Sequence, residues 1–205
     1  VHLFDDNSSL KIDKSIKERI LNFKELLKTK IDLIILSPGI DKKRCKLKNF
    51  LKKRNKDIYT DLDVFYSFNK NISVSITGTN GKSTTCKLLY DILKDQKIDV
   101  RLAGNIGTPI LSINKISKKT VLVIEASSYQ LEYSKIFSSK FGVILNIAPD
   151  HLERHGNLNN YIKAKFRIFK NQKRGAVGFV NKNDHLIQKG LKAKKYKFKL
   201  INVDT

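Results

Sequence analysis

The chain has 205 residues, 40% of them hydrophobic, so it can bury a core, but no apolar run reaches the roughly 18 residues of a membrane span and no signal-peptide pattern opens it. The formal charge of +22 comes mostly from lysines spread over the whole length, without a known nucleic-acid-binding motif, so we expect neither nucleic acid nor a membrane as a partner. Cys45 and Cys86 form no metal-ligand pattern and no disulfide framework, which favours a reducing, cytoplasmic location.

The first part of the chain predicts a small α/β unit. "VHLF" (1–4) is expected to form a short strand, and apolar residues at helical spacing predict a helix over 14–29. "DLIILSPGI" (32–40) predicts a buried strand that ends in a Ser-Pro-Gly turn. A basic helix over 46–55 and a short strand "DIYT" (57–60) complete the alternation, which is typical of a doubly wound α/β fold.

A polar linker around Asn69–Asn71 precedes a second round of alternation. A helix is expected after the first strand of this round, with Leu88, Leu89, Ile92 and Leu93 on one side, and another over 159–171. The strands are expected at 72–77, 100–104, 120–127, 141–148 and 175–181. Their continuous apolar runs favour a parallel sheet covered on both faces. We therefore predict two units, residues 1–69 and 70–205.

The stretch "SITGTNGKSTTCKLL" (75–89) predicts a phosphate site, although Gly78 stands closer to Gly81 than in the common P-loop pattern. Backbone N–H groups at a helix N-terminus are unsatisfied and attract an anion. Glycines let the backbone approach the phosphate oxygens. Lys82 is expected to reach the β- and γ-phosphates, and Ser83 or Thr84 to offer a hydroxyl to Mg²⁺.

Three other residues are candidates whose sequence context leaves alternatives open. Glu125 ends a predicted buried strand, so it is either a capping or turn residue or a metal ligand beside the loop. His151 also follows a strand, where a lone histidine is either structural or a ligand. Lys165 lies on a lysine-rich helix and by itself reads as part of a solvated face.

Four segments in order carry a resemblance to a known family. "TGTNGKST" resembles the nucleotide loop of the Mur ligases and of the related folylpolyglutamate synthetases. "GNIGTP" (104–109), "EASSYQLE" (125–132) and "NIAPDHLERHG" (146–156) resemble further Mur ligase signatures, and "YIKAKFRIF" (161–169) follows at the expected place. The segment "SSYQLE" resembles the D-glutamate-adding member, whose first domain "LSPGI" and "DIYTDLDVF" also fit.

The resemblance implies a partial Rossmann-like N-terminal domain, which binds the UDP-substrate, before an ATP-binding central domain of P-loop type. The central domain has a mostly parallel sheet and is incomplete at its C-terminal end. The implied activity is ATP-dependent ligation of D-glutamate to UDP-N-acetylmuramoyl-L-alanine through an acyl phosphate. That reaction belongs to peptidoglycan synthesis, and hence to cell-wall formation, cell shape and division. The resemblance also implies a cytoplasmic monomer.

The resemblance assigns ATP to the loop residues Gly78, Thr79, Asn80, Gly81, Lys82, Ser83 and Thr84. It implies two Mg²⁺ ions held by Ser83, Glu125, His151 and Lys165, with Lys82, Lys165 and His151 as catalytic residues. Lys165 is implied to react with CO₂ and bind metal as a carbamate. That reaction requires a neutral amine, so we expect burial or cationic neighbours to lower the pKa of Lys165, with Arg167 as a candidate neighbour.

The resemblance places further residues at the UDP-substrate. Asn105, Ser127 and Gln130 are implied near its reacting carboxylate, although Asn105 has the alternative of stabilising a turn. Asp6, Asn7, Ser37 and Gly39 are implied at its UDP part. His155 receives no role.

The ends of the chain suggest a fragment. It contains no methionine and starts at Val1. The resemblance implies that the family's first strand precedes Val1 and that a third domain follows Thr205, so we expect that this chain is not active alone. Two alternatives remain open: another Mur-type or folylpolyglutamate-type amide ligase, or a non-catalytic nucleotide-binding remnant.

Overall fold

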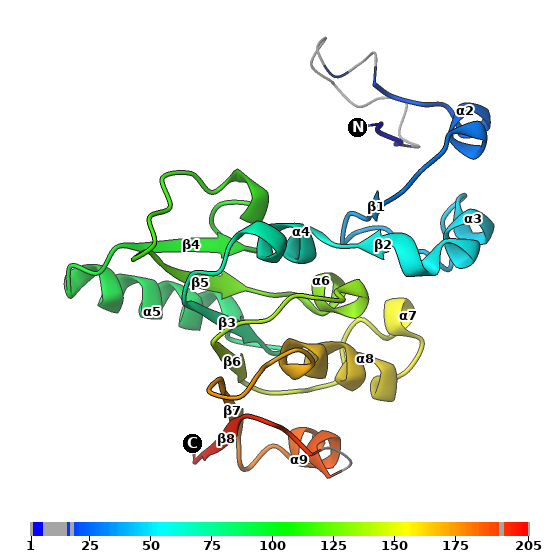
Figure 1. Cartoon of the computed structure of the whole chain (residues 1–205). Coiled ribbons are helices and arrows are strands. Elements are labelled where there is room, and N and C mark those ends of the chain that lie inside the picture. The colour runs from blue at the N-terminus through cyan, green and yellow to red at the C-terminus, as the bar shows by residue number, and fades with distance from the viewer. Residues whose placement is uncertain (1, 6–15, 17–18, 193–194, 205) are drawn as a thin grey trace.

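A parallel sheet of six strands, in the order β4-β5-β3-β6-β7-β8, is the centre of the fold (Figure 1). The computed structural model describes residues 2–5, 16, 19–192 and 195–204. The strands are β3 (Ser73–Thr77), β4 (Val100–Gly104), β5 (Val121–Glu125), β6 (Phe141–Ile144), β7 (Val177–Asn181) and β8 (Lys199–Val203). Every pairing between them is parallel, which confirms the predicted α/β class.

The two faces of this sheet carry separate hydrophobic clusters. Val123 packs with Ile76 and with Cys86 of α5 (Lys82–Asp95) on one face. Leu122 and Ile124 belong to the larger cluster on the other face, as the alternation of side chains along a strand requires. The remaining helical segments of this part are η2 (Ile110–Ser112), α6 (Ser128–Tyr133), α7 (Leu152–His155), α8 (Leu158–Lys165), η3 (Phe166–Phe169) and α9 (His185–Leu191).

The N-terminal part has its own two-stranded parallel sheet. Its elements are α2 (Phe23–Lys28), β1 (Ile34–Ile35), α3 (Lys48–Lys53), η1 (Asn55–Asp57), β2 (Ile58–Tyr59) and α4 (Asp61–Phe68). Leu36, Leu51 and Ile58 form a small core there. Helix α4 instead contributes Leu62 and Phe65 to the large core of the six-stranded sheet, so the boundary at 69/70 stays a prediction.

The predicted helix over 14–29 does not run through: Ile16 is helical, but the described residues 19–22 are not. Ile20 forms an isolated bridge with Leu3, which is also all that is seen of the predicted strand at 1–4. The helix begins at Phe23 because Asn22 caps it, with a reciprocal hydrogen bond from the Asn22 backbone to the side chain of Glu25.

Two further predictions made from apolar residues were only partly correct. The strand expected at 32–40 is only Ile34–Ile35, and Ile35 is 44% exposed. On α5, Leu89 and Leu93 pack on the core, whereas Leu88 and Ile92 are 59% and 50% exposed. The four residues therefore do not share one side, because the buried stripe of this helix is centred on Cys86 and residues three and seven positions later.

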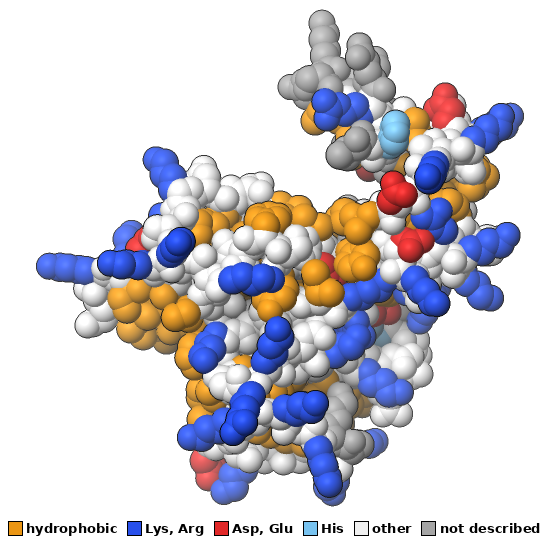
Figure 2. All heavy atoms as spheres, in the orientation of Figure 1, with side chains coloured by type: hydrophobic (Ala, Val, Ile, Leu, Met, Phe, Trp, Pro, Cys, Tyr) orange, Lys and Arg blue, Asp and Glu red, His pale blue; other side chains and the backbone are white. Residues whose placement is uncertain are grey.

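The charged surface agrees with the dispersed lysines of the sequence. On the face shown in Figure 2, lysine and arginine side chains are scattered over most elements rather than gathered in one patch. None of the helices formed by the described residues has the length and apolarity that crossing a bilayer requires.

Candidate functional site

Contacts within the protein fix the conformation of the loop between β3 and α5. Gly81 caps α5 with a φ of +78°, a conformation that favours glycine. A Cβ on Gly78 would lie 3.1 Å from the Cβ of Leu145. Asn146 holds the other side of the loop, because its carbonyl and its side-chain oxygen accept the N–H groups of Thr79 and Asn80 at 3.0 and 2.9 Å.

Thr79 links this loop to a second strand end and to α8. Its hydroxyl lies 2.9 Å from the N–H of Ala148, 3.2 Å from the Ala148 carbonyl and 3.1 Å from the Tyr161 hydroxyl. The structure therefore brings together three of the segments singled out in the sequence: the loop at 77–84, the segment after β6 and helix α8.

Two lysines converge on one carbonyl of the loop. Lys82 donates to the Gly78 and Thr79 carbonyls at 2.9 and 2.7 Å, and Lys165 donates to the Gly78 carbonyl at 2.6 Å. Lys165 is only 1% exposed. Burial, followed by the positive charge of Lys82, lowers the pKa of Lys165 to about 7, against the opposing effect of Asp150.

The direction expected for the Lys165 pKa is thus confirmed, but the expected neighbour is wrong. Arg167 points elsewhere and donates to the carbonyls of Leu131 and Ser134. The cation that acts on Lys165 is Lys82.

Glu125 stands at the carboxyl end of β5 and is 1% exposed. Its Oε1 accepts a hydrogen bond of 2.8 Å from the Asn105 side chain, and its backbone carbonyl accepts the Asn105 N–H at 2.9 Å. Its Oε2 is buried without a hydrogen-bond partner in the described part of the protein. A buried carboxylate oxygen left open in this way fits a cation, which would remove the cost of the missing partner.

A cation here would need further ligands. Among the described residues, no group of three or more His, Cys, Asp or Glu side chains is arranged to hold a metal. Burial, together with the charge of Glu125, raises the pKa of Cys86 to about 12, so this thiol does not supply a thiolate. The set near Glu125 is therefore an oxygen site that hydroxyl and phosphate oxygens could complete, as Mg²⁺ prefers.

The two histidines after β6 have different surroundings. His151 caps α7 in a left-handed conformation, and its side chain is 45% exposed with Nε2 3.3 Å from Asp150. His155 is buried with Nε2 3.1 Å from the Ser128 hydroxyl. His151 is therefore accessible to a ligand, whereas His155 packs inside.

The residues predicted at the substrate occupy two regions. Ser127 caps α6, and the Gln130 side chain accepts from the Ser127 N–H at 3.1 Å and donates to Asp61 at 3.0 Å. Ser37 and Gly39 lie in a turn closed by the Ile40 N–H on the Ser37 carbonyl, at 3.0 Å. The other two predicted residues, Asp6 and Asn7, lie outside the described residues.

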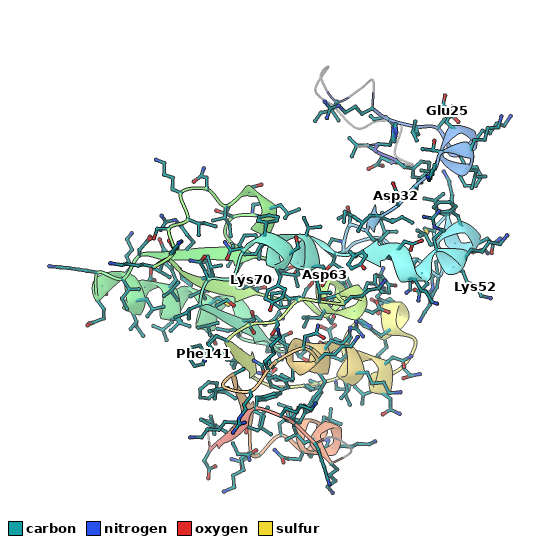
Figure 3. The ribbon with its side chains drawn as sticks, in the orientation of Figure 1. Glu25, Asp32, Lys52, Asp63, Lys70 and Phe141 are labelled. Carbon is teal, nitrogen blue, oxygen red and sulfur yellow. The ribbon has the colours of Figure 1, made fainter. Side chains whose placement is uncertain are left out.

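Sequence reasoning missed a buried carboxylate at the start of α4, labelled in Figure 3. Asp63 accepts the N–H groups of Lys135, Ile136 and Phe137 at 2.8 to 2.9 Å, and the Ser134 hydroxyl at 3.0 Å. The spacing of Thr60 and Asp63 could have indicated the capping box of α4, but no local signal indicates the distant amides.

Comparison with known proteins gives one family match and many relatives. The Mur ligase middle domain matches residues 76–204. Among curated relatives, the UDP-N-acetylmuramoylalanine--D-glutamate ligase of Rickettsia bellii is 40% identical over 80% of this chain and 36% of its own length. The protein of the same name from Caldicellulosiruptor bescii is 46% identical over 69% of this chain and 31% of its own length. The chain thus spans about a third of the relatives' length.

Solved structures share the fold at low identity. One is the UDP-N-acetylmuramate:L-alanyl-gamma-D-glutamyl-meso-diaminopimelate ligase from Neisseria meningitides. The match includes 97% of this chain and 68% of that one, with a TM-score of 0.61 and 14% identity. MurF ligase from Thermotoga maritima, solved in complex with ADP, covers 86% of this chain, and 48% of its own chain is covered, with a TM-score of 0.54 and 19% identity.

Proposed function

The chain belongs to the Mur ligase family, and from this premise we propose that it carries the ATP site of a ligase that joins D-glutamate to UDP-N-acetylmuramoyl-L-alanine. The observation that carries the proposal is the convergence of Lys82 and Lys165 on the carbonyl of Gly78 in a glycine-bearing loop. The choice of D-glutamate is supported by the names of relatives that are 38 to 46% identical. Residues 1–69 would bind the UDP-substrate, and residues 70–205 ATP.

The loop would hold the terminal phosphates of ATP. Its backbone N–H groups at the start of α5 attract an anion, and Gly81 already has the required backbone conformation. Lys82 now donates to two loop carbonyls. Since a charged acceptor forms stronger hydrogen bonds than a carbonyl, its ammonium would turn to the phosphate oxygens when ATP binds.

The proposal includes two Mg²⁺ ions. Ser83 and Glu125 would hold one, because Glu125 has a buried oxygen that lacks a partner among the described residues. His151 and Lys165 would hold the other, with Lys165 as a carbamate. A pKa of about 7 leaves much of the Lys165 amine neutral near pH 7, as its reaction with CO₂ requires. Bound Mg²⁺ neutralises negative charge on the phosphoryl group during its transfer.

In the proposed reaction, a carboxylate oxygen of the UDP-substrate attacks the γ-phosphorus and the bond to ADP breaks. The amine of D-glutamate then attacks the acyl carbon, and phosphate leaves as the amide forms. Lys82 and the loop amides would stabilise the charge on the transferring group. Asn105, Ser127 and Gln130 would lie near the reacting carboxylate.

The remaining assignments belong to the same proposal. The first region, with Asp6, Asn7, Ser37 and Gly39, would bind the UDP part of the substrate. The ligase would act as a monomer in the cytoplasm.

An assay of ADP release tests the proposal. It uses the polypeptide that the cell makes from this sequence, with UDP-N-acetylmuramoyl-L-alanine and one amino acid at a time. We expect release with D-glutamate and none with L-glutamate, and loss of release in Lys82→Met. Release with a different amino acid would favour another Mur-type or folylpolyglutamate-type ligase. Nucleotide binding without release would favour a non-catalytic remnant.

A further inference from the structure

Arg154 joins the turn that contains Ser37 and Gly39 to the segment that contains His151. It lies in α7, and 9% of its surface is exposed. Its guanidinium donates from Nη1 to the Gly39 carbonyl at 3.3 Å and from Nη2 to the carbonyls of Pro38 and Ile40 at 3.3 and 2.8 Å. Three successive carbonyls of one turn therefore meet a single side chain from a distant part of the chain.

The guanidinium is itself held in place by α6. Its Nε lies 3.3 Å from Oε2 of Glu132, whose side chain is 16% exposed. Its Cζ lies 5.0 Å from the ring centroid of Tyr129 and 5.5 Å from that of Tyr133. A planar guanidinium suits this arrangement because it can stack on rings and donate in several fixed directions, which an ammonium cannot.

The backbone couples Arg154 to His151. The His151 carbonyl accepts the N–H groups of Arg154 and His155, both at 3.1 Å. The ring of His151 also lies 5.0 Å from that of Tyr129, one of the two rings beside the guanidinium. His151 and Arg154, which holds the 37–40 turn, thus lie close together on the chain and beside the same tyrosine.

We propose that Arg154 is a positioning residue that sets the 37–40 turn against the His151 segment, so that the two ends of one UDP-substrate are held at a fixed separation. The proposal rests on the proposed function, which places the UDP part at Ser37 and Gly39 and the reacting end near His151. Arg154 does not act on ATP in this account. Loss of its contacts should therefore weaken binding of the UDP-substrate, in the ground state and the transition state alike.

The test compares Arg154→Met with Arg154→Lys, Glu132→Gln and a matched control, Arg101→Met. Methionine keeps an unbranched apolar stem against the tyrosines but removes all donors. Lysine keeps the charge, and Glu132→Gln keeps the guanidinium but weakens its anchor. Arg101 pairs with Asp99 and donates to the carbonyl of Lys115, so it offers the same kind of contact away from the turn.

Two measurements are made on the full polypeptide. Hydrogen exchange reports on the amides of Ser37, Gly39 and Ile40, and steady-state kinetics give KM for the UDP-substrate, KM for ATP and kcat. We expect Arg154→Met to speed exchange in the turn and to raise KM for the UDP-substrate about tenfold or more, with KM for ATP and kcat within about twofold. Arg154→Lys and Glu132→Gln should give smaller changes in the same direction, and Arg101→Met none.

Each outcome decides a part of the proposal. Unchanged exchange in all three variants would overturn the coupling. Faster exchange with an unchanged KM for the UDP-substrate, or with equal losses for both substrates, would overturn the positioning role and leave a structural contact. A wild-type protein that does not bind the UDP-substrate would refute the proposed function and the positioning role with it, while exchange would still report the coupling by itself.

Discussion

The ammonium of Lys165 lies 2.6 Å from the carbonyl oxygen of Gly78, in the loop between β3 and α5, and is out of contact with solvent. The same carbonyl accepts a hydrogen bond from Lys82 at 2.9 Å. Two cations that share one acceptor repel each other, and one of them is desolvated. The arrangement therefore favours a neutral Lys165 and explains why its pKa is lowered.

This pKa makes the stability of the fold depend on pH. The pKa of Lys165 falls from 10.5 to about 7 on folding, so between these values the unfolded chain holds a proton that the folded chain has released. Stability should then rise with pH, by roughly 1.4 kcal/mol per unit from this group. In metal-free and CO₂-free buffer, Lys165→Met should abolish this pH dependence of the unfolding free energy. The gain in stability of the variant over wild type should be largest below pH 7.

Denaturant unfolding between pH 6 and 9.5 provides the measurement. Lys163→Met is the control, since it removes a lysine from an exposed position of the same helix. Equal pH profiles for wild type and Lys165→Met would show that Lys165 keeps its proton in the folded chain.

We expect the Glu125 carboxylate to bind a cation and not to stabilise the fold. Glu125→Gln keeps the shape and an acceptor for Asn105, and it replaces a buried charge whose second oxygen has no partner among the described residues. We expect the variant to be at least as stable as wild type, and the Mg²⁺-dependent part of its ADP affinity to fall by about tenfold or more. Calorimetric titrations with and without Mg²⁺ measure this, with Glu25→Gln, at an exposed position of α2, as control. An unchanged dependence on Mg²⁺ would exclude Glu125 as a ligand.

Gly104 should be irreplaceable for a steric reason. It has a φ of +106°, and a Cβ there would lie 2.2 Å from the carbonyl oxygen of Glu125. Gly104→Ala should therefore cost more than about 3 kcal/mol and displace Glu125. Gly156→Ala is the matched control, since Gly156 also has a positive φ but no atom within 4 Å of an added Cβ. It should cost only about 1–2 kcal/mol. Equal losses in thermal unfolding would contradict the steric explanation.

Asp63 should be a structural anchor. Its Oδ1 accepts N–H groups of Ile136 and Phe137 at 2.8 and 2.9 Å. Asp63→Asn would direct an N–H₂ group at part of this set of donors or leave some of them unpaired. We expect a loss of about 2–4 kcal/mol in unfolding free energy. Asp57→Asn breaks only a partly exposed pair with Arg54 and should cost less than about 1 kcal/mol. A small effect of Asp63→Asn would mean that the amides find water instead.

Much of the central sheet could be predicted because its strands are short apolar runs with loops at their ends. β3, β4 and β7 begin and end within two residues of the predicted bounds. The predictions failed where one local interaction outweighed the apolar pattern, as at the Asn22 cap of α2. They also failed on α5, where the exposed Leu88 and Ile92 have the same character as the buried Leu89 and Leu93.

The site was predictable where a motif coincides with a strand end. The loop around Gly81 and the glutamate at the end of β5 were expected from the residues themselves, whereas the lowered pKa of Lys165 was expected only from the family resemblance. Arg154 and Asp63 were not, because many of their partners are backbone groups more than 70 residues away, which leave no trace in a sequence. Arg167 was wrongly placed beside Lys165 for a related reason: proximity along a helix does not determine which way a side chain points.

The central claim is that this loop holds ATP while its γ-phosphoryl group is transferred to a carboxylate of the UDP-substrate. The most direct measurement uses UDP-N-acetylmuramoyl-L-alanine with both carboxylate oxygens labelled with ¹⁸O, in the polypeptide that the cell makes, with ATP and D-glutamate. Mass spectrometry of the released phosphate should find one ¹⁸O atom per molecule, transferred when the acyl phosphate breaks down, and the amide carbonyl should keep the other. Unlabelled phosphate from a reaction that forms the amide would contradict the account, because the carboxylate would not have been phosphorylated.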